Sequence, residues 1–125
     1  MPHRTFIVIG AVLGALAVAL GAFGAHGLGA VLEANGRAAT FDTAAHYHLA
    51  HALALVITGV AARALPGRWM RWAGWLFLAG VILFSGSLYI LAIFDLGVMG
   101  AVAPVGGAAL IGGWLCLALA AWQGV

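Results

Sequence analysis

The sequence predicts an all-α integral membrane protein in which four transmembrane helices form one bundle. Of its 125 residues, 66% are hydrophobic and 6% are charged, with a mean hydropathy of +1.16, whereas a soluble domain carries about 25% charged residues. The apolar residues also gather in four long runs, and about 20 apolar residues cross a bilayer core as a helix. This composition excludes a soluble enzyme, a disordered chain and a disulfide-linked secreted module.

The four runs give the predicted helices in order, at residues 5–25, 44–62, 69–94 and 99–123 of a single membrane domain that spans residues 1–125. The first run follows His3 and Arg4, as the apolar core of a signal peptide would. Its apolar core is nevertheless longer than the usual length of about 7–15 residues. We therefore expect the first run to be retained as a transmembrane helix.

The longest connection, residues 27–43, joins the first two predicted helices. Apolar residues at helical spacing predict a short amphipathic helix within it, and Asn35-Gly36 predicts where that helix ends. A polar residue ahead of the next apolar run should cap the second transmembrane helix. The candidates for this cap are Thr40, Asp42 and Thr43.

The arginines predict the orientation in the membrane. Four lie on one predicted side, at the N-terminus and around the Pro66-Gly67 turn, and only Arg37 lies on the other; the four are Arg4, Arg63, Arg68 and Arg71. Because cytoplasmic loops carry the excess of basic residues, we expect both termini and the Pro66 turn in the cytoplasm of a multi-pass inner-membrane protein. Five arginines without a basic run are too few for a nucleic-acid surface.

Small residues at helical spacing predict how the helices pack. Inside lipid, helices associate through close packing and polar contacts, and GxxxG-like spacings let two backbones approach. The candidate packing glycines lie in the first and fourth helices: Gly10, Gly14, Gly106, Gly107, Gly112 and Gly113. These faces suit packing within one bundle, an interface with a second copy, or both.

Polar side chains gather on the side opposite the arginines. We expect a pocket there, in the outer half of the bundle, because intramembrane polar groups face the protein interior; its residues are His26, Tyr47, His51, Ser85 and Tyr89. One face of the second helix should look inward; it carries Thr43, Tyr47, His48, His51 and Thr58. His51 should lie about 10 Å below the outer end of that helix, at the depth of Tyr89, so that the two can form a hydrogen bond.

Several chemistries remain open for these groups. They can form structural hydrogen bonds between helices, or His26, His48 and His51 can bind zinc or copper. Two histidines can also hold haem iron, and a Tyr–His pair can bind a quinone carbonyl or pass protons. The sequence contains no HExxH, CxxC or CxxCH motif, so no cofactor is identified.

Four strings together resemble one known family. They are GAFGAHGL at 21–28, the spacing of Thr43, Tyr47 and His51, LFSGSLYILA at 83–92, and APVGG at 103–107. In this combination the chain resembles the YgdD/YwdK-type family of small inner-membrane proteins, a domain-of-unknown-function family. The resemblance implies a four-helix membrane protein of about this length and no settled activity. It implies a shared motif that consists of His26, Tyr47, His51, Ser85, Ser87, Tyr89 and Pro104. His46 and His48 are not part of this motif.

These observations favour a non-enzymatic accessory or interaction module that is embedded in the lipid bilayer. Its expected partner is a second copy or another membrane protein. The alternatives are metal, haem or quinone binding at the polar pocket, and a small oligomeric transporter or proton pathway.

Overall fold

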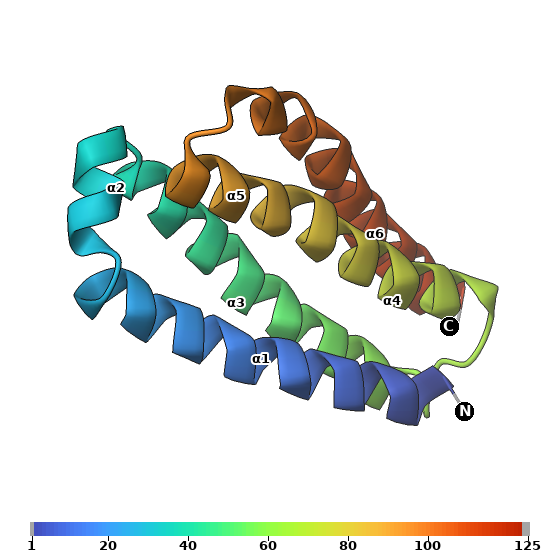
Figure 1. The fold of residues 1–125 in the computed structure, drawn as a ribbon. Coiled ribbons are helices and arrows are strands. Elements are labelled where there is room, and N and C mark those ends of the chain that lie inside the picture. The colour runs from blue at the N-terminus through green and yellow to red at the C-terminus, as the bar shows by residue number, and fades with distance from the viewer. Residues whose placement is uncertain (1, 124–125) are drawn as a thin grey trace.

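The computed structural model describes residues 2–123, which fold into helices joined by short turns (Figure 1). In chain order the elements are α1 (Pro2–His26), α2 (Gly29–Asn35), α3 (Ala38–Ala61), α4 (Arg68–Gly80), the π-helical turn η1 (Val81–Ser85), α5 (Gly86–Phe94), the 3₁₀ helix η2 (Gly97–Ala101) and α6 (Ala103–Gln123).

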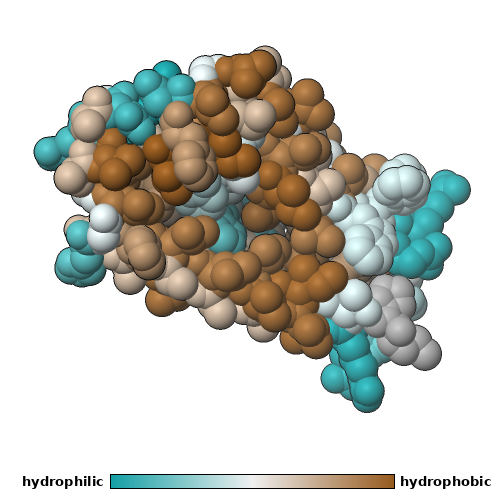
Figure 2. Space-filling model, viewed as in Figure 1, coloured by the Kyte–Doolittle hydropathy of each residue, from teal (hydrophilic) through white to brown (hydrophobic). Residues whose placement is uncertain are grey.

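Four stretches are long and apolar enough to cross a membrane: His3–His26, Ala38–Ala61, Arg68–Phe94 and Gly97–Gln123. Figure 2 shows a hydrophobic belt between two hydrophilic ends, the surface expected of a protein in lipid. Both chain ends lie at one end of the bundle and α2 lies at the other (Figure 1). The prediction of four membrane-spanning helices is confirmed.

In the connection between α1 and α3, the end of the short helix agrees with the prediction, whereas the start of the next helix differs from it. The short helix α2 ends at Asn35, and Gly36 adopts the left-handed conformation that stops it, with φ of 64°. The next helix, however, begins at Ala38, six residues earlier than predicted. The predicted side-chain cap is absent at this end: Thr43 Oγ1 donates to the carbonyl of Ala39, one turn earlier in the same helix.

Tertiary burial explains the early start of α3. Phe41 lies in the added turn and is 2% exposed, packed with Leu32 of α2 and Ala92 of α5. Burying a large aromatic side chain stabilises the segment that carries it. The added residues place the histidines of α3 farther from the start of their helix than the sequence predicted.

Helix α3 lies between α1 and the span formed by α4, η1 and α5, and α6 packs on that span (Figure 1). Helix α1 packs mainly along α3, α3 packs against the span formed by α4, η1 and α5, and α6 packs against α4 and η1. The central core contains Phe6, Leu55, Phe77 and Leu110 from these four spans. Helix α1 is the peripheral member, since 17% of its most apolar stretch is buried against 44% for α3.

Close helix contacts occur at three of the six predicted packing glycines. Gly10 lies against Ala52 and Val56 of α3, Gly106 against the backbone of η1 at Phe84, and Gly113 against Phe77. Gly107 and Gly112 border neighbouring side chains at ordinary distances, and the space next to Gly14 is open. Four further glycines make close contacts: Gly24, which prolongs the small-residue stripe of the first predicted helix, and Gly59, Gly74 and Gly80, which the sequence analysis missed.

Candidate functional site

His51 and Trp114 form a polar contact near the middle of two membrane-spanning helices. They lie close to the centres of α3 (Ala38–Ala61) and α6 (Ala103–Gln123), respectively. Trp114 Nε1 is 3.0 Å from His51 Nε2, and His51 Nδ1 is 2.8 Å from the Tyr47 carbonyl oxygen. The expected depth of His51, about 10 Å from the end of its helix, is wrong because α3 begins at Ala38.

These two hydrogen bonds fix the proton on the His51 ring. An indole N–H only donates, so Nε2 must accept through its lone pair. A carbonyl oxygen only accepts, so Nδ1 must carry the hydrogen and donate it to Tyr47. In this tautomer, the Nε2 lone pair that a metal ion would need is already engaged by the indole N–H of Trp114.

Aromatic rings surround this contact. The Tyr47 ring stacks on the His51 ring at 5.8 Å between centroids and 5° between planes, and the Phe77 and Trp114 rings meet edge to face at 5.0 Å. Tyr47, Phe84, Ile111 and Trp114 line a lateral groove of about 320 Å³ beside His51. Because Tyr47 is 42% exposed and Trp114 46% exposed, this groove opens toward the lipid.

His48 forms a second buried contact, between α3 and α5. Its Nδ1 lies 2.8 Å from the Tyr89 hydroxyl oxygen, and the residue is 4% exposed. The expected partner of Tyr89 was His51, and that prediction is wrong. Within residues 2–123, His48 Nε2 is buried with no hydrogen-bond partner, although the ring interacts electrostatically with the Leu13 backbone of α1. Figure 2 shows hydrophilic atoms in a hollow between α1 and α5, where Figure 1 places α3.

The predicted pocket residues do not all converge. His26 is exposed at the end of α1, and Thr43 and Tyr47 are exposed on α3, whereas His48 and His51 are buried. The inward face of α3 was therefore predicted correctly for His48, His51 and Thr58, and wrongly for Thr43 and Tyr47. The part of the chain that the structure describes contains no group of three histidine, cysteine or acidic residues able to hold a metal. The metal set His26, His48 and His51 is thus not assembled.

The two motif serines serve helix packing. Ser85 Oγ donates to the Ala44 carbonyl of α3 at 2.9 Å, and both residues are buried. Ser87 Oγ donates to the Phe84 carbonyl within its own span. Ser85 ends the π-helical turn η1, and such turns often redirect side chains at functional positions. Here the turn accompanies a direct hydrogen bond from the third span to α3.

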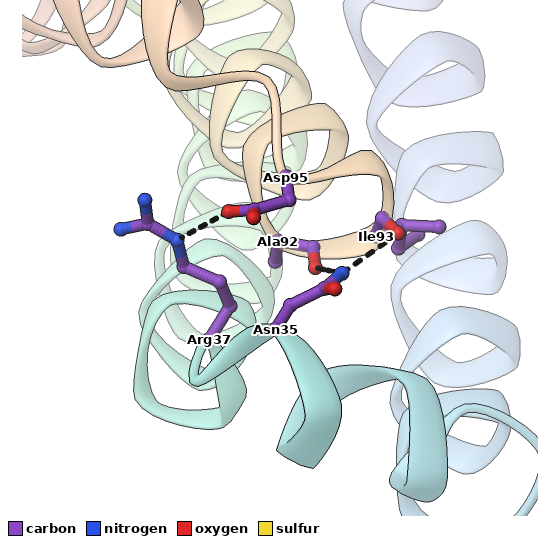
Figure 3. Close-up of polar contacts among 5 residues, drawn as sticks. All are labelled: Asn35, Arg37, Ala92, Ile93 and Asp95. Atoms are coloured by element: carbon purple, nitrogen blue, oxygen red, sulfur yellow. Dashed lines mark hydrogen bonds and ion pairs between the residues drawn. The ribbon is translucent and has the colours of Figure 1, made fainter.

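Sequence reasoning missed a polar cluster at the α2 end of the bundle (Figure 3). Asn35 Nδ2 donates to the carbonyls of Ala92 at 3.0 Å and Ile93 at 3.1 Å, in the last turn of α5. Those carbonyls have no partner within their own helix. Arg37 Nε lies 3.3 Å from Asp95 Oδ1, and Asp95 ends α5 in the left-handed conformation. The signal was the Asn35-Gly36 pair, which the sequence analysis used only as a helix stop.

Comparison with known proteins places this architecture in a family. The model of the family described as "Protein of unknown function (DUF423)" matches residues 20–107, which include His48, His51, Ser85 and Tyr89. The chain belongs to the DUF423 family. The resemblance to YwdK-type proteins inferred from the sequence is confirmed.

Relatives of this DUF423 chain match it over nearly its whole length. The UPF0382 membrane protein YwdK of Bacillus subtilis is 43% identical over 119 residues, which cover 94% of this chain and 96% of the relative. The UPF0382 membrane protein SH2409 of Staphylococcus haemolyticus is 40% identical over 120 residues, which cover 96% and 97%. No solved structure matches the chain. The chain is therefore a multi-pass membrane protein of a family whose function is unknown.

Proposed function

We propose that this protein is a non-enzymatic accessory module of the inner membrane that binds a transmembrane helix of a partner. The observation that carries this proposal is that the buried polar groups are already engaged in hydrogen bonds within the protein. Both ring nitrogens of His51 are engaged, and Ser85 bonds a backbone carbonyl. Groups occupied in this way hold helices together and are unavailable as an acid, a base or a nucleophile.

The exposed surface of α1 supports the interaction role. Gly10, Ala17 and Gly24 recur every seven residues and face α3. Gly14 and Gly21 form a parallel row with open space beside them, next to the α3 contact. Small residues let a second backbone approach closely, so this open row suits another transmembrane helix.

Native mass spectrometry of the protein extracted in lipid nanodiscs tests the proposal. We expect the mass of a second copy or of another membrane protein in addition to the chain, and the measured mass distinguishes the two. Gly14→Leu should abolish the association without unfolding the chain, because the space at Gly14 is open. The matched control is Ala15→Leu, at an exposed position on another face of α1. A monomer with no partner mass would overturn the proposal.

The lateral groove beside His51 favours a second candidate function, binding of a membrane-soluble carbonyl compound such as a quinone. Tyr47 lines this groove and is 42% exposed, and its hydroxyl group can donate a hydrogen bond to a carbonyl oxygen. The same measurement distinguishes the two functions. Under this alternative, the monomer carries an additional small lipophilic mass that is lost in Tyr47→Phe. A monomer without that mass would exclude it.

We also infer that both termini and the Pro66 turn face the cytoplasm. The excess of arginines at that end supports this orientation. In cells, a membrane-impermeant thiol reagent should fail to label a Pro66→Cys variant in which Cys116 is replaced by alanine. Labelling before the membrane is permeabilised would contradict the inferred orientation.

A further inference from the structure

A stripe of arginine and tryptophan side chains runs along one face of α4 where the helix begins. Arg68, Arg71, Trp72 and Trp75 follow one another at helical spacing and line a hollow of about 280 Å³. The two arginines belong to the first turn of the third span, and Trp75 lies about two turns along it. The hollow therefore has a cationic entrance and an aromatic wall.

The charges at this entrance lack an acidic counterpart at their end of the protein. All three acidic side chains of the chain lie at the opposite end of the bundle: Glu33 in α2, Asp42 near the start of α3 and Asp95 at the end of α5. Among the described residues the ion pair of the chain joins Arg37 to Asp95, also at that opposite end. Arg68 and Arg71 are both exposed, so their guanidinium groups are available to an external anion.

Aromatic contacts hold the stripe in place. The Arg68 guanidinium lies 5.2 Å from the Trp69 ring centroid, a cation–π geometry that orients it. Trp75 meets Phe6 of α1 edge to face at 5.2 Å. Trp72 and Trp75 remain 57% and 47% exposed, so they present apolar surface to whatever enters the hollow from the lipid.

We propose that this stripe is a binding site for one anionic phospholipid. Arg68 and Arg71 receive the phosphate, because guanidinium groups form charge-assisted hydrogen bonds with phosphate oxygens. The acyl chain runs along Trp72 and Trp75 into the membrane. The hollow fits a lipid better than a soluble phosphate because its wall below the arginines is apolar and lies within a membrane span. The site goes beyond the accessory function and does not depend on it.

Tryptophan quenching by a brominated lipid tests the site. The protein is placed in phosphatidylcholine nanodiscs with increasing amounts of brominated phosphatidylglycerol, and brominated phosphatidylcholine serves as the neutral comparison. We expect saturable quenching by the anionic lipid at low mole fraction. Arg68→Gln and Arg71→Gln should each weaken its apparent affinity by about tenfold or more. Arg71→Lys should lose part of the affinity because an ammonium lacks the planar fork.

Arg63→Gln is the matched control, since Arg63 carries the same charge near the same end but does not line the hollow. If the lipid binds specifically in the hollow, Arg63→Gln should lose only the general surface attraction of one arginine, no more than about fivefold in affinity. Equal losses for Arg63→Gln and Arg71→Gln, full retention in Arg71→Lys, or equal quenching by the two brominated lipids would overturn the proposal. Displacement by millimolar inorganic phosphate would identify the ligand as a soluble anion and would also overturn it.

Discussion

His51→Ala should lower the free energy of unfolding by about 3 kcal/mol, because it removes two hydrogen bonds and opens a cavity near the middle of the membrane. The indole N–H of Trp114 would lose its acceptor in surroundings where water is absent. The ring also packs on Phe77 at 5.9 Å between centroids. Equilibrium unfolding in mixed micelles, followed by circular dichroism, measures the change.

His46→Ala is the matched control for this prediction. His46 lies on the same helix and is exposed, so its removal should change stability by less than about 0.5 kcal/mol. Trp114→Phe keeps most of the ring packing and deletes the donor. We expect it to cost about 1 kcal/mol. Equal stabilities for the His51→Ala and His46→Ala proteins would contradict a structural role for the His51–Trp114 contact.

Gly106→Ala should destabilise the protein by about 2–3 kcal/mol, because it forces α6 away from the third span. A Cβ atom at Gly106 would collide with the backbone of η1 at Leu83 and Phe84. A backbone cannot move aside as a flexible side chain can. Thermal unfolding in detergent should therefore show a lower midpoint for this variant.

The neighbouring glycine provides the comparison. A Cβ atom at Gly107 would lie 3.6 Å from the Phe84 ring, an ordinary packing distance. We expect Gly107→Ala to leave the midpoint nearly unchanged, since replacing glycine by alanine inside a helix is favourable where space allows. If both variants melt at the same temperature, the close approach of α6 to η1 at Gly106 is incorrect.

The membrane spans were predictable from sequence because lipid requires long apolar helices. The start of α3 was not predictable in this way. Phe41 lies next to the polar residues of AATFDT, and this local sequence is typical of a loop. In the folded protein, Leu32 and Ala92 bury Phe41, and this contact is not visible in the local sequence. Local cap preferences favoured a later start, and tertiary burial determined the observed one.

The sequence predicted which polar residues of the candidate site are buried better than it predicted which of them form hydrogen bonds with one another. Helical spacing indicated that His48 and His51 share a side of α3, and both are buried. It gave no information on which neighbouring helix each one meets. Tyr89 therefore bonds His48 rather than His51, and the partner of His51 is Trp114 of α6, which sequence reasoning had not included. Such pairings depend on helix rotation and order, which are properties of the whole bundle.

The His51–Trp114 contact has a consequence for the rotation of the helices. Trp114 Nε1 lies 3.0 Å from His51 Nε2, and the Phe77 ring packs against both rings. A hydrogen bond requires its donor to point at its acceptor, whereas packing between apolar side chains has no preferred direction. The contact therefore sets the angle to which α6 is turned about its own axis relative to α3.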